Sequence, residues 1–291
     1  MSGPLFVSER SKPELTTRPL SVGCLIFERM DQIDFTGPFE VLSRMPDTTV
    51  QAIGKELSPI RDMQGLRLSP DIKIAETVLF DVLLVPGGYG QQALMHDEEV
   101  LGLIRKHVQG GKLLFSVCTG ALICGAAGVL TERQVTTHWR TRDLMRHYGA
   151  VVVDARVVVD GNIISGAGVT AGLDAALVLV SLLRGVAAAQ EIQLAIEYAP
   201  DPIFHSGTPE RGAAHRICGA MRRPRSCRDR IKRATSTRLR SGDSYLRLRI
   251  TRCTWNLQFF RRPGKSYTSC DRRSSAAGDA LANCRWADGL A

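Results

Sequence analysis

The sequence lacks the features that mark several common classes of protein. Its eight cysteines include no pair at the Cys-x-x-Cys spacing of zinc sites. The N-terminus has no apolar signal core, and no apolar run reaches the length of a transmembrane helix. The glycine-rich stretch 87–90 is not followed by the Lys-Ser/Thr pair of a phosphate-binding loop. We therefore expect a cytoplasmic protein in a reducing compartment, with no metal ion, no cofactor and no membrane contact.

Charge and composition divide the 291 residues into two parts. Residues 1–210 hold 18 Lys and Arg against 24 Asp and Glu, whereas residues 211–291 hold 20 against 5. The second part has no Glu and no Val, and it shows no sustained helical period. It is a nucleic-acid-binding segment, a disordered extension or an out-of-frame product. The abrupt change in composition favours the last two, so we do not expect nucleic acid as a partner.

The hydrophobic pattern predicts one folded domain over residues 20–210. Residues 1–19 are polar and without a period, which predicts a loose N-terminal extension. Deletion of the basic tail, residues 211–291, is expected to leave the domain folded. Strands are predicted at 20–27, 48–55, 80–85, 112–117, 151–153, 156–159 and 162–165, with a hairpin at 60–68 and an extended piece at 135–138. Helices are predicted at 35–42, 97–108, 120–127, 139–148, 170–183 and 188–198. This alternation predicts an α/β fold with a mainly parallel sheet flanked by helices.

The stretch from Ser116 to Gly120 has the layout of a nucleophile elbow. Cys118 stands between a predicted strand and a predicted helix, with small residues two positions before and two after it. Its place at a helix N-terminus favours the thiolate over the thiol. A buried structural cysteine is the alternative. Because ligands of parallel sheets bind beyond the carboxyl ends of the strands, we expect Cys118 to share a cleft with Gly87 and Gly88.

Six motifs in order make residues 20–210 resemble the DJ-1/PfpI superfamily, whose flavodoxin-like sandwich is related to class I glutamine amidotransferases. They are Gln-Ile-Asp-Phe-Thr-Gly-Pro at 32–38, Val-Pro-Gly-Gly at 85–88, Ser-Val-Cys-Thr-Gly at 116–120, Thr-Thr-His-Trp at 136–139, the glycine-rich stretch 165–174 and the segment 194–200. Within the family the chain is similar to the isonitrile hydratases. Thr119 stands where protease-like members carry His, and Asp34 stands where glyoxalase-type members carry Glu.

The resemblance implies a cofactor-free, homodimeric hydro-lyase that acts on a small isonitrile. It implies Cys118 as the nucleophile, Asp34 as its acidic partner and Thr119 as the elbow threonine. Attack of Cys118 on the terminal carbon gives a thioimidate, and water then releases an N-substituted formamide with Asp34 as general acid and base. The loop at Gly87 and Gly88 and the Thr119 amide are candidates for binding developing charge.

Alternatives stay open for several residues and for the function. Asp34 or Thr36 also fits a helix cap. His138 is a candidate at the substrate site, although a structural histidine is the favoured role, and Val169 is expected to shape the pocket. The same motifs resemble the ligand-sensing domains of AraC-type transcription regulators. A DJ-1-like glyoxalase, deglycase or chaperone is the third interpretation.

Overall fold

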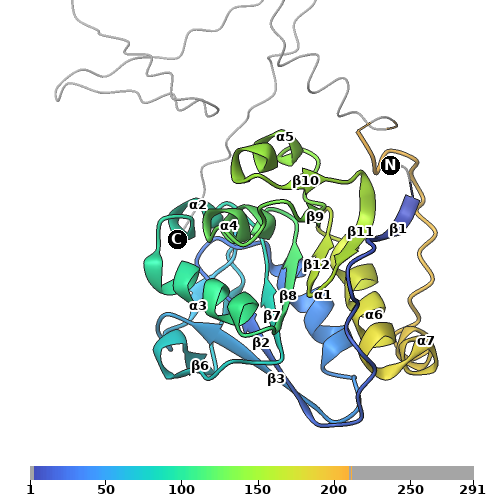
Figure 1. The fold of residues 1–291 in the computed structure, drawn as a ribbon, viewed down its shortest axis with the longest axis horizontal. Helices are drawn as coiled ribbons and strands as arrows, with labels where there is room; N and C mark the ends of the chain where they lie inside the picture. Colours follow the sequence, from blue (N-terminus) through green and yellow to red (C-terminus); the bar gives the residue numbers. More distant parts are fainter. Residues whose placement is uncertain (1–2, 210, 212–291) are drawn as a thin grey trace, which may run out of the picture. The chain divides into compact units, whose positions relative to one another are not determined.

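The computed structural model of the chain describes residues 3–209 and 211. Its centre is an eight-stranded sheet with the order β1-β11-β12-β8-β7-β2-β3-β6 (Figure 1). The strands are β1 Gly3–Val7, β2 Leu20–Leu25, β3 Thr48–Gly54, β6 Ile72–Lys73, β7 Val82–Val85, β8 Leu113–Val117, β11 Ala155–Asp160 and β12 Ile163–Gly166. Every neighbouring pair is parallel except β11 and β12. The predicted mainly parallel sheet is therefore confirmed.

Two groups of helices cover the two faces of this sheet (Figure 1). One group is α1 Gln32–Leu42, α6 Ala171–Arg184 and α7 Val186–Ala195, and the other is α2 Gln91–Leu94, α3 Glu98–Gln109 and α4 Gly120–Ala126. The strand order explains this division. The crossover from β2 to β3 runs across the sheet in the opposite direction to the crossover from β7 to β8. Right-handed crossovers then place their helices on opposite faces.

The remaining elements are short. β4 Ile60–Arg61 and β5 Arg67–Leu68 form the predicted hairpin, and β9 Gln134–Val135 pairs with β10 Val151–Val152. Helix α5 covers only Arg142–Met145 before a 3-10 turn at Arg146–Tyr148, so the helix predicted over 139–148 begins later than expected. The core lies between the sheet and the helices, and all four residues of β7 are buried.

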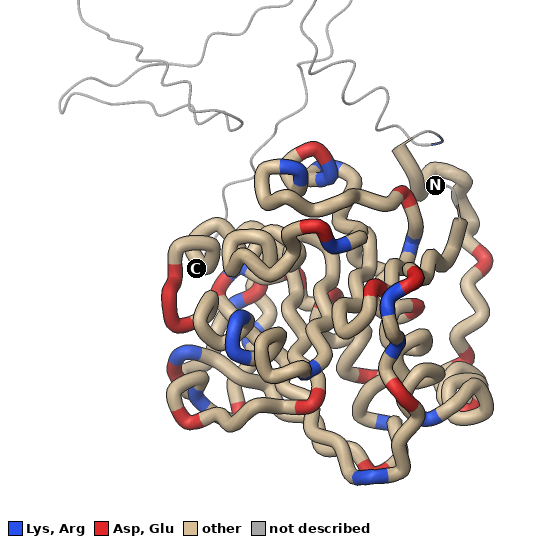
Figure 2. The backbone as a smooth tube through the Cα atoms, viewed as in Figure 1, with Lys and Arg blue, Asp and Glu red and all other residues tan. Residues whose placement is uncertain are grey.

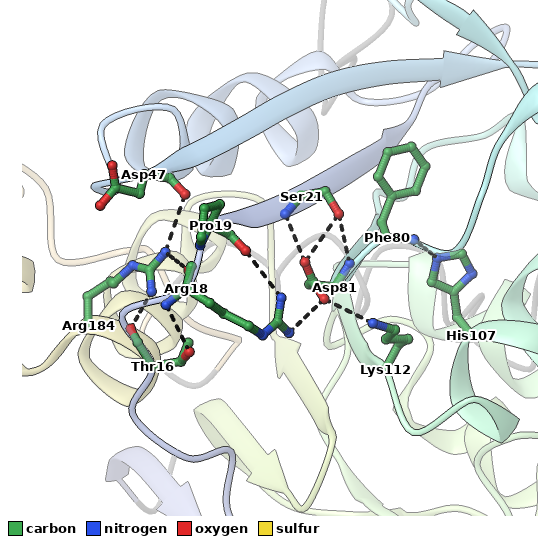
Figure 3. Close-up of polar contacts among 10 residues, drawn as sticks. All are labelled: Thr16, Arg18, Pro19, Ser21, Asp47, Phe80, Asp81, His107, Lys112 and Arg184. Carbon is green, nitrogen blue, oxygen red and sulfur yellow. Dashed lines mark hydrogen bonds and ion pairs between the residues drawn. The ribbon is translucent and has the colours of Figure 1, made fainter.

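The first residues of the chain fold onto the sheet, which corrects the expectation of a loose extension. Strand β1 pairs in parallel with β11. Further along, the Thr16 amide donates to the Leu183 carbonyl at 3.0 Å. The Arg184 guanidinium donates to the main-chain carbonyls of Thr16, Arg18 and Asp47 (Figure 3). It also donates to the Pro46 carbonyl. The sequence pattern gave no sign of these contacts because their partners are main-chain groups far apart in the chain.

Asp81 provides a second attachment for the same segment. Its carboxylate pairs with Arg18 at 2.8 Å and with Lys112 at 2.9 Å, and it accepts hydrogen bonds from the amide and hydroxyl of Ser21 (Figure 3). These bonds to the charged form hold the pKa of Asp81 well below its usual range, although its partial burial acts in the opposite direction. The N-terminal segment is thus joined both to α6 and to the start of β7.

Charged positions of both signs are interspersed around the described residues (Figure 2). Within this part of the chain, no helix is both long enough and apolar enough to cross a membrane. The basic tail predicted from composition lies outside the described residues, apart from Arg211.

Candidate active site

Cys118 lies at the sharp turn between β8 and α4. Its φ of +57° falls in the left-handed region, which is strained for a residue with a side chain. Its amide donates to the Gly166 carbonyl at 3.1 Å, and its carbonyl accepts from Thr137 Oγ1 at 2.8 Å. A Cβ on Gly120 would lie 2.2 Å from the Val85 carbonyl oxygen, so a side chain does not fit there. This geometry is that of a nucleophile elbow, as the spacing predicted.

Gly87 and Gly88 follow β7 and bring α1 and the elbow into contact. Gly88 has a φ of +119° and forms an isolated bridge with Met30. A Cβ on Gly88 would lie 2.3 Å from the Asp31 nitrogen. A Cβ on Gly87 would lie 2.5 Å from Thr119 Oγ1 and 2.9 Å from Asp34 Oδ2. The absence of both side chains is therefore what allows these segments to approach each other.

Asp34 lies in the first turn of α1 and is completely buried. The cap of this helix is Asp31, which accepts from the Ile33 amide at 3.2 Å, so the proposed caps Asp34 and Thr36 were wrong. Asp34 Oδ2 accepts from the Gly87 amide at 2.9 Å. Its Oδ1 atom is buried without a hydrogen-bond partner among the described residues. Burial first, and then the charge of Asp31, raise the pKa of Asp34 to about 8. The carboxyl is therefore mostly protonated at neutral pH.

The Cys118 side chain is almost fully buried and is coupled to Asp34. Burial, and then the negative charge of an ionised Asp34, raise the pKa of the thiol above its usual value. A hydrogen bond from the Thr119 amide acts in the opposite direction but is the smaller effect. The expectation of a favoured thiolate is therefore corrected, because the helix N-terminus does not outweigh the loss of water. In the resting site both groups carry their protons.

Thr119 joins the elbow to the glycine pair. Its Oγ1 atom accepts from the Gly88 amide at 2.9 Å. The Gly87 amide is bound to Asp34 in the same way. Both glycine amides therefore already donate hydrogen bonds to side chains. These bonds would have to break before either amide could bind negative charge that develops on a substrate. The Thr119 amide and hydroxyl are therefore the remaining candidates for binding such charge beside the Cys118 thiol.

A cavity of about 380 Å³ opens beside Cys118. Gly88, Thr119, His138 and Val169, all proposed from the sequence, line it. Asp34 and Gly87 are not among its lining residues, and the Gly87 amide donates to Asp34 beside Thr119. Several further residues that line the cavity had no role predicted from the sequence. They include Asp31, Met63, Leu122, Trp139, Arg140 and Leu144. Trp139 is the last residue of the recognised motif 136–139 and Arg140 directly follows it, so their place in the sequence was the available signal.

His138 is placed beside the cavity but is not hydrogen-bonded to Cys118 in the described structure. Its Nδ1 atom accepts from the Arg140 amide at 3.3 Å, which puts the hydrogen of the neutral ring on Nε2. Burial first, and then the charges of Arg140 and Arg142, lower the pKa of His138. The ring also contacts Trp139, with 5.6 Å between the centroids. These contacts favour a neutral, structural histidine over a base for the thiol.

No group of three or more His, Cys, Asp or Glu side chains that could hold a metal ion occurs among residues 3–209 and 211. The other two cysteines in this range, Cys24 and Cys124, are free and fully buried. Burial raises the pKa of both thiols, so neither resembles a second reactive centre. Of the three cysteines in this range, only Cys118 lines the cavity.

Comparisons with known proteins agree with this geometry. The DJ-1/PfpI family model matches residues 21–182. An isonitrile hydratase from Pseudomonas putida is 43% identical over 204 residues, which cover 70% of this chain and 90% of that protein. A glutathione-independent glyoxalase from Caenorhabditis elegans is 30% identical over 134 residues, covering 45% and 72%. The crystal structure of a ThiJ/PfpI family protein from Pseudomonas syringae superimposes with a TM-score of 0.67 at 36% identity, covering 70% and 84%.

Proposed function

Because the chain belongs to the DJ-1/PfpI family, we propose that it is an isonitrile hydratase, which adds water to an isonitrile to give an N-substituted formamide. The observation that carries this proposal is the protonated carboxyl of Asp34, whose Oδ1 atom is unpartnered among the described residues and which is coupled to the Cys118 thiol. The terminal carbon of an isonitrile must receive a proton and a nucleophile at the same atom. A carboxylic acid and a thiol at one end of a cavity supply both.

In the first step, the Cys118 sulfur forms a bond to the terminal carbon while Asp34 donates its proton to that carbon. The proton of the thiol passes to Asp34, which ends the step protonated as it began. The triple bond between carbon and nitrogen becomes a double bond, and the product is a thioimidate. This route needs no free thiolate in the resting site, which agrees with the raised pKa of Cys118.

In the second step, water adds to the thioimidate carbon. Asp34 accepts a proton from the water and transfers a proton to the nitrogen, which leaves a tetrahedral intermediate. The carbon–sulfur bond then breaks, the hydroxyl proton passes through Asp34 to the sulfur, and the formamide is released with the thiol restored. The Thr119 hydroxyl, held at Gly88, is the candidate hydrogen-bond partner of the intermediate.

The test is an assay of the purified full chain with an aryl isonitrile, following the N-formyl product. We expect turnover by the wild-type chain and none by Cys118→Ala or Cys118→Ser, both of which should remain folded. In Asp34→Asn, a Cys118 adduct without release of formamide would place Asp34 in the hydrolytic step. Absence of any adduct would place it in the first proton transfer. A wild-type chain that forms no formamide, or a fully active Cys118→Ala variant, would contradict the proposal.

A glyoxalase is the second candidate, supported by the similarity to the Caenorhabditis elegans protein. The same enzyme samples are assayed with methylglyoxal, and its removal without any formamide from isonitriles would replace the hydratase. The remaining alternative, a sensor domain of a regulator, predicts sequence-specific DNA binding by the full chain. We rank it last because the tail lacks a helix-turn-helix pattern.

We also propose a homodimer, which the family resemblance implies, and a location in the cytoplasm, which was expected from the sequence composition. Sedimentation of the active chain measures its mass directly, and a monomer with full activity would exclude a functional dimer. Fractionation of cells that express the chain tests its location.

A further inference from the structure

We infer that the isonitrile carries a carboxylate and that Arg140 recognises it. The inference rests on the proposed function and adds the class of substrate. Arg140 and Cys118 line the same cavity. A molecule whose isonitrile carbon reaches the thiol can therefore present a second group to the guanidinium.

Arg140 differs from the arginines around it in having no carboxylate partner among the described residues. The neighbouring arginines are all paired: Arg133 with Asp160 at 2.9 Å, Arg142 with Asp154 at 2.7 Å, Arg146 with Asp143 at 2.7 Å and Arg156 with Asp174 at 2.5 Å. Basic and acidic positions accordingly lie side by side along α5 (Figure 2). An unpaired guanidinium on a cavity wall is suited to bind an anionic ligand.

The Arg140 side chain is held in place by an aromatic ring. Its guanidinium carbon lies 4.9 Å from the centroid of the Trp139 ring. The turn beneath it is closed by the Arg140 amide on His138 Nδ1 and by the Thr141 amide on the His138 carbonyl at 2.9 Å. A guanidinium that lies over a ring uses its face for this contact. Its N–H groups point outward in the plane, where they can form two parallel bonds to a carboxylate.

The rest of the cavity suits an apolar body between the two ends of the substrate. Its wall includes Met63, Leu122, Leu144 and Val169. Asp31 is the other lining residue that can carry charge at neutral pH apart from Arg140. It caps α1 and approaches Gly88, on the side of the glycine pair. The lining therefore offers one unpaired cation, and it favours an isonitrile with an aryl or alkyl body and a terminal carboxylate.

The test compares 4-isocyanobenzoate with 4-isocyanobenzamide, and the 3-substituted pair, as substrates of the full chain. The two members of each pair have nearly the same shape and differ in charge, so their ratio of kcat/KM measures recognition of the carboxylate. In at least one pair we expect the wild-type chain to favour the carboxylate by about tenfold, as for one charge-assisted contact made by an exposed guanidinium. Arg140→Gln should reduce the ratio to about one, and Arg140→Lys should give an intermediate ratio. Arg146→Gln, which alters an arginine outside the cavity lining, is the matched control and should keep the wild-type ratio.

A binding measurement separates this inference from the proposed function. Calorimetry gives the Kd of 4-formamidobenzoate and 4-formamidobenzamide, and of their 3-substituted isomers, without requiring turnover. Tighter binding of a carboxylate that is lost in Arg140→Gln would support the inference even if neither isonitrile were hydrated. Equal kcat/KM and equal Kd within both pairs would overturn it while leaving hydration of isonitriles intact. A preference for the carboxylate that survives in Arg140→Gln would also overturn it.

Discussion

Asp34 Oδ2 accepts a hydrogen bond from the Gly87 amide at 2.9 Å, while Oδ1 of the same carboxyl is buried without a partner among the described residues. This asymmetry determines where the proton of the neutral acid lies. The carbonyl oxygen of a carboxylic acid is a better acceptor than its hydroxyl oxygen, so the bond from the Gly87 amide favours Oδ2 as the carbonyl and Oδ1 as the carrier of the proton. Gly87 thus orients the acid, and its missing side chain leaves the space that the Asp34 carboxyl occupies.

Asp34→Asn should abolish turnover and yet stabilise the fold. The pKa of Asp34 is raised from 3.8 to about 8, so the folded state holds a proton that the unfolded chain has released at neutral pH. The stability that Asp34 contributes is fully present below pH 3.8 and is lost as the pH rises toward 8. Asn needs no proton and can still accept from the Gly87 amide. We expect a gain of about 4 kcal/mol at pH 7.

Urea unfolding of the wild type and of Asp34→Asn between pH 3.5 and pH 8.5 measures this gain. The difference between the two proteins should grow with pH up to about 8 and should be small near pH 3.5. A difference that is independent of pH would mean that Asp34 is ionised in the folded protein. The assignment of Asp34 as the proton donor would then fail.

The pH dependence of the reaction should follow the same carboxyl. Because the proposed first step needs a protonated Asp34, kcat/KM should fall on the alkaline side with a midpoint near pH 8. Rates with a neutral isonitrile between pH 6 and pH 10 give the profile of the free enzyme. A value of kcat/KM that rises through this range would instead indicate that the Cys118 thiolate is the limiting species.

Gly87→Ala should damage the site with little disturbance elsewhere. The added Cβ would lie 2.6 Å from the Thr119 nitrogen and 2.9 Å from Asp34 Oδ2, so both groups must move. We expect kcat/KM to fall by roughly 100-fold, the usual effect of a misplacement of about 1 Å in a catalytic group. Gly102→Ala in α3 is the matched control, since its Cβ would meet no atom within 4 Å. It should keep full activity and gain about 1 kcal/mol of stability, because Ala is the better helix former.

Arg184→Ala should destabilise the fold by releasing the N-terminal segment. Arg184 is the common donor to the carbonyls of Thr16, Arg18 and Asp47 (Figure 3). Loss of these charge-assisted bonds should lower the free energy of unfolding by about 2 kcal/mol. Arg44→Ala, which removes an exposed pair with Glu40, is the control and should cost less than about 0.5 kcal/mol. Equal effects of the two substitutions in urea unfolding would show that the Arg184 bonds to the N-terminal segment contribute no more to stability than an exposed ion pair.

The sequence alone was sufficient for six of the eight strands of the sheet, most helices and the place of Cys118. These features depend on local patterns, because the side-chain period distinguishes strands from helices and the small residues around Cys118 permit the turn. The helix predicted at 97–108 corresponds to α3 for the same local reason, since Asp97 caps its start and Gly110 ends it. The family motifs also brought Asp34 into consideration, while its position left a helix cap as the alternative.

Only the tertiary structure decided how these groups are solvated and which distant segments they meet. Asp34 is a buried acid rather than a cap because the loop at Gly87 closes over it and excludes water, while Asp31 takes the cap. The same exclusion of water keeps the Cys118 thiol protonated, although the helix N-terminus favours the thiolate. Strand β1 joins the sheet because the edge of β11 offers unpaired main-chain groups, which no pattern within residues 3–7 could reveal. Desolvation and long-range pairing depend on the folded arrangement of the whole domain, and a local sequence pattern does not contain them.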